Sequence, residues 1–534
     1  MALLERLQGL TAAAALANRA TNSPEQPYVL FKDTVLTYGQ TEMRSEALAA
    51  SLSGFGVGTG DRVALILPPV PEFVISVFAV AKLGAVLVPI NPQVSPPELQ
   101  FALRQSEAKA AVTVETFAGR DFIAIFEDLL PQLRELHHLV TVGEEDLWYD
   151  DRIFQFEDAL SAGEGRDYDA PAIDPSSDAF AILHTAGTTG KPKGVEVTHQ
   201  SLLETSAHTV AAIGLRPDDR IVGLVGLFHA FGLGPGVLGT LLAGASMVLQ
   251  DEFAAAATLD LVARHSATVH YGVPPLFSAE LREQETRARD LGSLRIGIVA
   301  GGTLSDEQLA AVQQRICPNL QVAYSVTETS STVSITRPED PAEKRRFTVG
   351  RPLPGTVVRV LDAEGAELPV ESVGEIAVRG PGVMSGYLRQ PKETAAAIDD
   401  NGFLRTGDLG IIDEEGFVHL VGRRREVIIR SGLSVYPREV EQRLEAHPAV
   451  ERAAAIGIPD DTLGEAICAC LLLEEGALVT PEEIREWCRV ALADYKVPDQ
   501  VREFEEFPLT GSGKIRRVEL ARRISATSVV DPGT

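Results

Sequence analysis

The chain has 534 residues, of which 45% are hydrophobic and 23% charged, ordinary values for a globular protein with sizeable cores. At roughly 150 residues per domain, this length suits three or four domains, or one large multi-lobed domain and a small one. The net charge of −27 argues against a nucleic acid or an anionic membrane as partner, so an anionic ligand would need a locally basic site.

The cysteines indicate packing rather than chemistry. They are too few and too badly spaced for a disulfide framework or a zinc site: Cys317, Cys468, Cys470 and Cys488. Cys468 and Cys470 lie two residues apart in an apolar run, which puts them on one face of a strand. We expect both in the core.

Neither the N-terminus nor the longest apolar region predicts a secretory or membrane segment. Leucines recur at helical spacing over residues 3–10, but Glu5 and Arg6 interrupt them, so a signal peptide is not expected. Region 73–90 contains a lysine, a glycine and a proline, and is typical of a buried helix followed by a strand. We therefore expect no transmembrane segment and a cytoplasmic location.

Apolar runs alternate with amphipathic stretches over residues 37–332, which predicts α/β layers with largely parallel strands. Expected strands include 63–67, 85–90 and 296–300. This part of the chain is predicted to form most of a large, multi-lobed N-terminal domain.

From about residue 350 the pattern changes. Short strands such as 375–378 are punctuated by glycine, which indicates a β subdomain over about 350–424. A second boundary lies at Arg423-Arg424-Arg425, where a compact α+β unit begins. The predicted organisation is an α/β N-terminal domain over 1–424 and a small α+β C-terminal domain over 425–534.

One helix of the C-terminal domain has clear boundary signals. Thr480-Pro481-Glu482-Glu483 is typical of a helix start, with a capping box and a proline at the first helical position. The residues expected on its apolar face are Ile484, Trp487, Cys488, Ala491, Leu492 and Tyr495.

A Gly/Thr-rich loop follows an expected strand at 180–183. It reads Thr185-Ala186-Gly187-Thr188-Thr189-Gly190-Lys191-Pro192-Lys193-Gly194, with hydroxyls, ammonium groups and glycines that let backbone N–H groups approach an anion. The nucleotide loop G-x-x-x-x-G-K-[ST] is not met, because Pro192 supplies neither a magnesium-binding hydroxyl nor an N–H. We expect a phosphate loop of another kind rather than a mobile surface loop.

Residues 234–239 fit G-x-G-x-x-G, but no convincing strand precedes them and no acidic residue follows at about 20 positions. A nicotinamide-binding fold is therefore not supported. The glycines could leave room for a bulky apolar group, helped by Tyr271-Gly272-Val273, or could pack a tight glycine-rich helix. Both interpretations stay open.

Three further motifs carry groups suited to a nucleotide. Glu328 beside Thr327 would offer the oxygen ligand that magnesium prefers, although such a pair also caps helices. Tyr324 could stack on a base or belong to the core. Asp408, in an expected Thr406-Gly407-Asp408 turn, could bind hydroxyl groups or be an ordinary turn aspartate.

Five motifs in order resemble the signature of the adenylate-forming superfamily, which includes acyl-CoA synthetases, aryl-CoA ligases, luciferases and stand-alone adenylation domains. They lie at 185–194, 324–328, 404–408, 422–441 and 508–514. Earlier segments fit as well, so the resemblance covers nearly the whole chain. The chain departs from the usual motifs at Ala186, where a serine is usual, at Ser325, where a glycine is usual, and at Arg425, where aspartate or lysine is usual.

The resemblance implies an enzyme that uses ATP and Mg²⁺ to convert a carboxylic acid to an acyl-adenylate, then forms a thioester with coenzyme A. It implies catalytic roles for Lys514, Glu328, Thr327 and His229, with Glu328 and Thr188 as metal ligands. It implies nucleotide contacts for Thr185, Gly187, Thr188, Thr189, Gly190, Lys191, Lys193, Gly301, Gly302, Thr303, Tyr324, Asp408 and Arg423. It implies an acyl pocket formed by Phe228, His229, Phe231, Gly232, Tyr271, Gly272, Val273 and Ser325.

The family's C-terminal domain is mobile, and the resemblance extends this domain rotation to the present chain. During adenylation the lysine matching Lys514 bridges the acyl carboxylate and the phosphate. The second half-reaction swings that lysine out and brings the Gly432 loop beside a pantetheine tunnel. The hinge position is Arg425, a long cation that could make charge contacts specific to either state.

Substrate identity is less determined by the sequence. Amino-acid adenylation domains place an aspartate where His229 lies, and histidine cannot hold an α-ammonium well, so amino acids are disfavoured. A bulky apolar acid, whether fatty, aryl or polycyclic, is expected. Two alternatives stay open: an acyl-AMP ligase that loads a carrier protein's pantetheine, and a non-catalytic ligand-binding member of the fold. A homodimer is also possible.

Overall fold

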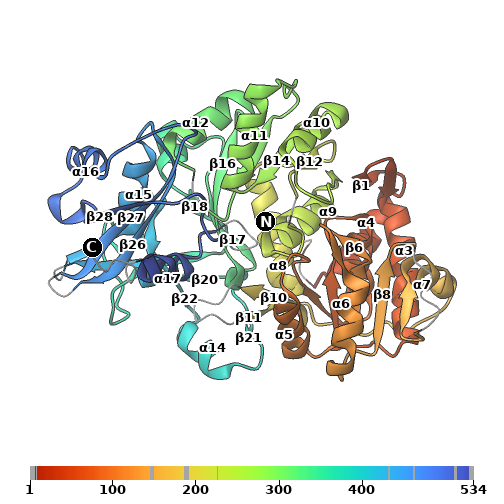
Figure 1. The fold of residues 1–534 in the computed structure, drawn as a ribbon. Helices are drawn as coiled ribbons and strands as arrows, with labels where there is room; N and C mark the ends of the chain where they lie inside the picture. Colours follow the sequence, from red (N-terminus) through yellow and green to blue (C-terminus); the bar gives the residue numbers. More distant parts are fainter. Residues whose placement is uncertain are drawn as a thin grey trace.

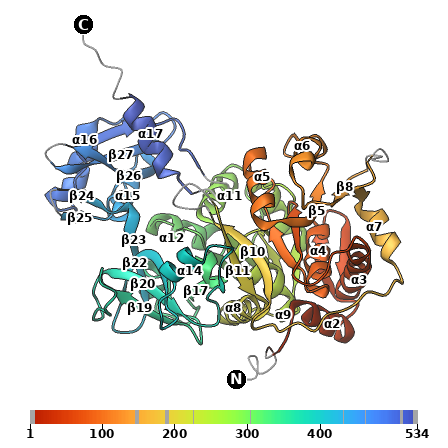
Figure 2. The same cartoon turned by 90° about the horizontal axis from the view of Figure 1, so that it is seen from below.

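The computed structural model describes residues 7, 9–144, 150–185, 192–224, 226–302, 304–430, 433–460, 463–509 and 514–527, with only the backbone described at 425, 434, 464 and 525–527. Figures 1 and 2 show the early part of the chain at one end of the molecule and the C-terminal unit at the other, with residues of the middle of the chain between them.

The first sheet has eight strands. In spatial order they are β21 (Gly386–Tyr387), β11 (Lys193–Thr198), β10 (Ala179–Thr185), β4 (Val86–Pro89), β3 (Arg62–Ile66), β5 (Ala108–Val114), β8 (His138–Val142) and β9 (Ile153–Gln155). From β10 to β9 the pairs are parallel, whereas β11 and β21 are antiparallel to their neighbours. Its helices are α3 (Tyr38–Gly54), α4 (Pro71–Lys82), α5 (Pro96–Ser106), α6 (Phe122–Leu129), α7 (Phe156–Gly163) and α8 (His199–Ala212).

The second sheet has nine strands. They are β18 (Arg351–Pro352), β17 (Ser331–Ile335), β16 (Leu320–Val326), β15 (Ile296–Val299), β14 (Val269–Gly272), β12 (Arg220–Val222), β13 (Ser246–Val248), β1 (Pro27–Phe31) and β2 (Thr34–Thr37). The strands from β16 to β1 pair in parallel. The associated helices are α2 (Ala12–Asn22), α9 (Gly239–Ala243), α10 (Ala255–His265), α11 (Pro274–Thr286) and α12 (Asp306–Arg315).

The core explains why the central strands read as continuous apolar runs. Residues 63–66 of β3 and residues 73–81 of α4 are fully buried, because helices and the neighbouring sheet cover both faces. The predicted helix followed by a strand at 73–90 is confirmed as α4 and β4. The strands predicted at 63–67 and 296–300 are confirmed as β3 and β15.

The predicted β subdomain is a four-stranded antiparallel sheet of β19 (Val357–Leu361), β20 (Gly374–Arg379), β22 (Leu404–Ile412) and β23 (Val418–Arg423). The short helix α13 (Ala342–Phe347) precedes this sheet in sequence, and α14 (Pro391–Ala397) lies between β20 and β22. The α/β fold with a large N-terminal part and a small C-terminal unit is confirmed; the exact domain boundaries stay a prediction.

The C-terminal unit is α+β, as predicted. It contains β24 (Ile428–Arg430), β25 (Leu433–Val435), β26 (Val450–Asp460), β27 (Gly464–Leu473) and β28 (Gln500–Glu503), with α15 (Pro437–Glu445), α16 (Pro481–Arg489) and α17 (Arg517–Thr527). It contacts the larger part of the chain through Arg282 of α11, whose guanidinium lies 3.3 Å from the Glu451 carboxylate.

Two predictions for this unit are confirmed and one is wrong in part. Cys468 and Cys470 on β27 are both buried in one apolar cluster, and α16 begins with the predicted capping box at Thr480. However, α16 ends at Arg489, so the apolar face does not continue along a helix to Tyr495. Leu492 and Tyr495 still pack on the same core, because a turn after Cys488 returns the chain to it.

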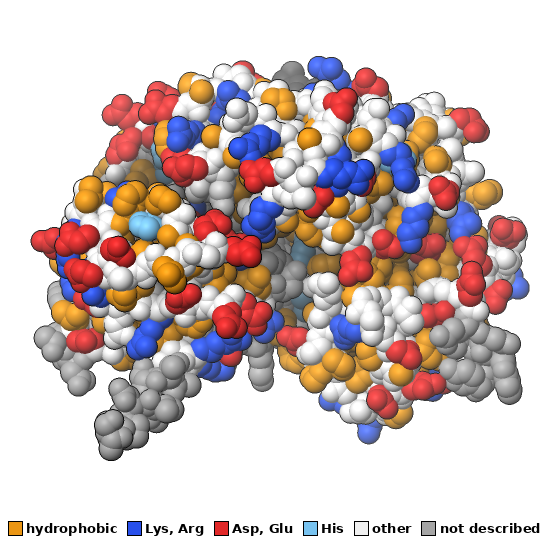
Figure 3. Space-filling model, turned by 45° about the horizontal axis from the view of Figure 1, so that its top comes forward, with side chains coloured by type: hydrophobic (Ala, Val, Ile, Leu, Met, Phe, Trp, Pro, Cys, Tyr) orange, Lys and Arg blue, Asp and Glu red, His pale blue; other side chains and the backbone are white. Residues whose placement is uncertain are grey.

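Among the described residues, no helix is long and apolar enough to cross a membrane. Figure 3 shows acidic and basic side chains intermingled over one face, without a continuous basic surface.

Candidate active site

The described residues on either side of the Gly/Thr-rich loop belong to two strands that pair with each other. Thr185 closes β10 directly opposite Lys193 at the start of β11, so an antiparallel hairpin holds the loop. Gly187, Thr188, Thr189, Gly190 and Lys191 lie outside the described residues. The Lys193 ammonium lies 4.3 Å from the centre of the Tyr387 ring, a cation–π contact that orients it.

Glu328 is held by a residue that the sequence motifs did not single out. The Tyr387 hydroxyl donates to Glu328 Oε1 at 3.0 Å, and the Met384 N–H donates to the Glu328 carbonyl at 2.9 Å. Thr327 and Glu328 form a single 3₁₀ turn, followed at once by β17. The helix-capping alternative is therefore wrong, since no helix follows this pair.

Tyr387 directly follows Gly386 at the end of a Gly-rich segment, and nothing in the sequence alone pairs it with Glu328. The pairing of β21 with β11 brings it there, at Tyr387 opposite Val195. One residue thus contacts both a basic group of the loop hairpin, Lys193, and the candidate metal ligand.

Asp408 lies at the centre of a second polar cluster. The Tyr324 hydroxyl donates to Asp408 Oδ2 at 2.7 Å, and the Arg423 guanidinium lies 3.1 Å from Oδ1. Burial, and then the adjacent Asp408 carboxylate, raise the pKa of Tyr324, so the phenol remains a donor. The negative charge of Asp408 raises the pKa of Arg423. Two predicted nucleotide residues, Tyr324 and Arg423, thus contact a third, Asp408.

The expected Thr-Gly-Asp turn is instead part of β22. Arg405 opposes Ala377 and Leu409 opposes Glu375, so the chain bulges between these two pairs. Gly407 has φ +75°, a left-handed conformation that glycine adopts without strain. The glycine therefore allows a bulge within a continuous strand rather than a chain reversal, and the turn prediction is wrong.

Lys514 reaches this cluster from the C-terminal unit. Its pKa is lowered by the protein atoms around it, although part of the side chain is exposed, and then by Arg423; Asp408, Glu426 and Glu328 act in the opposite direction. Charges from both polar clusters thus act on the Lys514 ammonium. A residue more than 80 positions from Arg423 in sequence thus joins them in space.

The predicted acyl-pocket residues include four aromatic side chains, of which Tyr271 is buried and the other three are half-buried. Phe228 and His229 have ring centres 4.4 Å apart, and those of Phe231 and Tyr271 are 5.4 Å apart. Burial, and then the charge of Lys514, lower the pKa of His229 to about 4, so this imidazole is neutral at pH 7. His229 therefore links the acyl-pocket candidates electrostatically to Lys514.

Some polar atoms among these residues lack partners. Within the described part of the chain, His229 Nε2, the Tyr271 hydroxyl and Ser325 Oγ are buried without a hydrogen bond. A buried polar group without a partner destabilises the folded protein. Such groups are common where a ligand supplies the missing partner. Three of the predicted acyl-pocket residues thus each have a buried polar atom without a hydrogen-bond partner.

The glycines at 232–239 are closely packed and do not leave an open space. They form a π-helical segment, Gly232–Leu238, with every residue buried. A Cβ at Gly232 would lie 2.1 Å from the Gly226 carbonyl oxygen, and one at Gly239 would lie 2.6 Å from Val210 Cγ1. Of the two alternatives, the structure favours the tightly packed glycine-rich helix.

The segment after β15 lies against the start of α11. A Cβ at Gly301 would lie 3.5 Å from Val273 Cγ1, and one at Gly302 would lie 3.1 Å from Pro274. A Cβ at Gly272 would lie 2.8 Å from Phe277, so this glycine is also closely packed. Thr303 lies outside the described residues.

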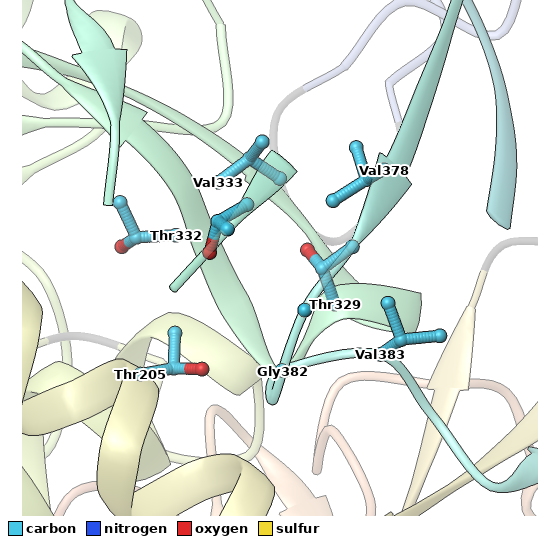
Figure 4. Close-up of a pocket in the computed structure, with 9 residues that line it drawn as sticks. Thr205, Thr329, Thr332, Val333, Val378, Gly382 and Val383 are labelled. Carbon is cyan, nitrogen blue, oxygen red and sulfur yellow. The ribbon is translucent and has the colours of Figure 1, made fainter. Parts of the chain in front are cut away.

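A small cavity of about 10 Å³ lies behind the Glu328 turn (Figure 4). It is lined by residues of α8, of the Glu328 turn, of β17, of β20 and of the loops before β19 and β21: Thr205, Thr329, Thr332, Val333, Thr356, Val378, Gly380, Gly382 and Val383. This volume is enough for about one water molecule. The cavity is therefore not the substrate site.

The hinge and the CoA loop are described only in part. Residues 424–426 form a short 3₁₀ turn after β23, and only the backbone of Arg425 is described. Gly432 lies outside the described residues. Their predicted roles are not tested by the geometry.

The comparisons with known proteins agree with this geometry. The family model for AMP-binding enzymes matches residues 16–388, and that for the AMP-binding enzyme C-terminal domain matches 439–514. The putative acyl-CoA synthetase YngI of Bacillus subtilis is 33% identical over 96% of this chain and 97% of its own length. The mitochondrial medium-chain acyl-CoA ligase ACSF2 of Homo sapiens is 29% identical over 97% of this chain and 88% of its own length.

Solved structures are also similar. The anthranilate CoA ligase AuaEII in complex with anthranoyl-AMP superposes with a TM-score of 0.89 at 26% identity, covering 98% of each chain. ATP-bound MatB from Rhodopseudomonas palustris superposes with a TM-score of 0.86 at 27% identity, covering 97% of this chain and all of its own.

The chain belongs to the AMP-binding enzyme family, a branch of the adenylate-forming superfamily. Within it, the protein is an AMP-forming acyl-CoA synthetase, an acid–thiol ligase. The non-catalytic alternative is thereby rejected. The family uses ATP, Mg²⁺ and coenzyme A. Glu328 suits the metal, because a carboxylate that accepts one phenolic hydrogen bond retains lone pairs for a hard cation.

Proposed function

We propose that this enzyme activates a bulky apolar carboxylic acid, whether fatty, aryl or polycyclic, as its adenylate and transfers the acyl group to coenzyme A. The observation that carries the proposal is the position of Lys514. It comes from the C-terminal unit, yet it interacts electrostatically with Asp408, Arg423 and Glu328. Because Lys514 belongs to a separate unit, it can be present for the first step of a two-step reaction and be withdrawn for the second.

In the first step, a carboxylate oxygen of the acid attacks the α-phosphorus of ATP, and pyrophosphate leaves with the electron pair of the broken P–O bond. Both reactants are anionic, so their approach depends on charge neutralisation. Arg423 pairs with Asp408, the charges of both act on Lys514, and Lys193 is oriented at the loop hairpin. We assign them this role, with Asp408 accepting from the ribose hydroxyls and Mg²⁺ neutralising phosphate charge when bound.

In the second step, the CoA sulfur, having lost its proton, attacks the acyl carbonyl carbon, and AMP leaves with the electron pair of the anhydride bond. A lysine that bridges carboxylate and phosphate would block this approach. We therefore propose that the C-terminal unit turns at Arg425, which withdraws Lys514 and presents the Gly432 loop.

The predicted acyl-pocket residues support the proposed acid class. Phe228, Phe231 and Tyr271 offer apolar surface, and His229 is neutral at pH 7 because its pKa is about 4. Each methylene buried there contributes about 0.8 kcal/mol. Two similar proteins, a medium-chain acyl-CoA ligase and an anthranilate CoA ligase, are consistent with an acid larger than acetate.

The test is a panel of acids, from acetate through medium-chain fatty acids to aryl and polycyclic acids, incubated with the protein, ATP, MgCl₂ and CoA. Pyrophosphate and thioester are followed in parallel. We expect catalytic efficiency to rise with acyl size until the pocket is filled. Acetate or a free amino acid as best substrate would contradict the acid class. If pyrophosphate forms without acyl-CoA and the acyl group is transferred to a carrier protein's pantetheine, the acceptor is the carrier protein rather than CoA.

A cytoplasmic location and a homodimer stay predictions.

A further inference from the structure

Glu375 on β20 is a buried carboxylate that the proposed mechanism does not use. Its side chain is 7% exposed, and it accepts hydrogen bonds on both oxygens. Oε2 accepts from Arg405 Nε at 2.9 Å and from the Arg424 guanidinium at 3.0 Å. Oε1 accepts from the Gly407 N–H at 3.2 Å. One side chain therefore connects three segments of the chain.

The Gly407 contact places Glu375 at the nucleotide cluster. Gly407 is the left-handed residue of the β22 bulge, directly before Asp408. The neighbouring Thr406 hydroxyl accepts from the Asp408 N–H at 3.1 Å and donates to the Ile376 carbonyl. Glu375 and Ile376 of β20 thus fix the bulge from which the Asp408 carboxylate extends toward Tyr324 and Arg423.

The Arg424 contact places Glu375 at the hinge as well. Arg424 precedes Arg425, and Glu426, which follows, pairs with Arg517 of α17 at 3.1 Å. The residue before Arg425 is therefore tied to the β subdomain, and the residue after it is tied to the C-terminal unit. A rotation between the two parts at Arg425 would therefore act directly on the Arg424–Glu375 ion pair.

We propose that Glu375 is a positioning residue that couples the nucleotide-binding bulge to the pivot of the C-terminal unit. This inference rests on the proposed two-step function. Displacement of Arg424 during rotation changes how Glu375 holds Gly407, and a nucleotide that settles against Asp408 changes how Glu375 holds Arg424. Such coupling is reciprocal by thermodynamic necessity.

The side-chain chemistry offers a specific substitution. A carboxylate has two acceptor oxygens, whereas the amide of Glu375→Gln has one oxygen and an NH₂ group. The amide cannot accept from the arginines and from the Gly407 N–H at the same time, so the link breaks while the shape is kept. Arg424→Met removes only the hinge side. Glu367→Gln, at an exposed ion pair with Arg359 beside the same sheet, is the matched control.

Full-length variants, including the Glu375→Gln/Arg424→Met double variant, are compared in two half-reactions: ATP–pyrophosphate exchange, and thioester formation from supplied acyl-adenylate and CoA. We expect Glu375→Gln to raise the KM for ATP about tenfold and to change the ratio of the two half-reaction rates by a similar factor, as loss of one charge-assisted hydrogen bond allows. Because the coupling is reciprocal, Arg424→Met changes the ratio and also changes the KM for ATP. In the double variant the arginine substitution adds no further change in the ratio. Glu367→Gln changes neither.

If the two substitutions changed the ratio of the half-reaction rates by factors that multiply in the double variant, the coupling would be refuted. It would also be refuted by a Glu375→Gln enzyme whose melting temperature falls while both half-reactions decrease equally, because that is a purely structural role.

A second readout does not depend on thioester synthesis. Trypsin cleaves after arginine, so its rate of cleavage within residues 423–425 reports on the hinge. We expect ATP to change this rate at least threefold in the wild type and not in Glu375→Gln. An equal effect of ATP on both proteins would refute the coupling. A wild type that responds to ATP but makes no thioester from any acid would instead refute the proposed function.

Discussion

Removal of the Tyr324 hydroxyl is the most specific test of the nucleotide cluster. Tyr324→Phe keeps the ring, which is 5% exposed, and deletes only the donor 2.7 Å from Asp408 Oδ2. A hydrogen bond to a charged group contributes about 1.5–3 kcal/mol. Because Arg423 still pairs with the other oxygen, we take the lower end of that range, which corresponds to roughly a tenfold effect at about 1.4 kcal/mol per decade.

We therefore expect Tyr324→Phe to lower kcat/KM for ATP about tenfold in pyrophosphate exchange, with the acid preference unchanged. Tyr28→Phe is the matched control, since its buried hydroxyl donates to the Val237 carbonyl at 2.8 Å and contacts none of the nucleotide residues. Both variants lose a buried hydrogen bond, but only the first disturbs Asp408. If both lowered the melting temperature alike and neither changed the ATP dependence, the assigned role of Tyr324 would be wrong.

The remaining predictions concern the cation, its titration, the pivot and the acyl end. Lys514→Ala should reduce adenylation by roughly 10²- to 10³-fold, the effect of removing one preorganised charge, and spare thioester formation from supplied acyl-AMP; equal losses in both half-reactions would contradict the two-state scheme. Because the pKa of Lys514 is lowered and the protonated form is the active one, adenylation should decrease with rising pH before a free lysine would titrate; a Lys514→Arg enzyme should lack this alkaline decrease, and its persistence would assign it to another group. Arg425→Pro should spare pyrophosphate release yet suppress thioester formation, because proline fixes φ and restricts the residue before it; unchanged CoA ligation would exclude Arg425 as the pivot. Ser325→Gly should change the preference among acids more than the KM for ATP, since Ser325 Oγ is buried without a partner; the reverse pattern would place this residue at the nucleotide.

Local signals in the sequence predicted much of the fold. The uninterrupted apolar run of β3, the buried α4 and the capping box at Thr480 each depend on neighbours close in sequence, so composition and spacing were sufficient. The end of α16 could not be predicted, because the apolar spacing continues beyond Arg489 while the chain has already turned.

The sequence predicted many of the site residues but not the contacts between them. The motifs supplied Tyr324, Asp408 and Arg423, and their contacts are consistent with a common role. Tyr387 and Glu375 were missed, because their partners are brought to them only by strand pairing between β21 and β11 and between β20 and β22. The bulge at Gly407 was taken for a turn, since a glycine between polar residues has the same local signature in both.

The central claim is that the acid is activated by direct bond formation to the α-phosphorus. The most direct measurement uses the best acid of the panel with both carboxylate oxygens labelled with ¹⁸O, followed by mass spectrometry of the products. The mechanism predicts that AMP carries one ¹⁸O atom and that the acyl-CoA carbonyl carries the other. Unlabelled AMP, with the label recovered in inorganic phosphate or retained in free acid, would contradict the account.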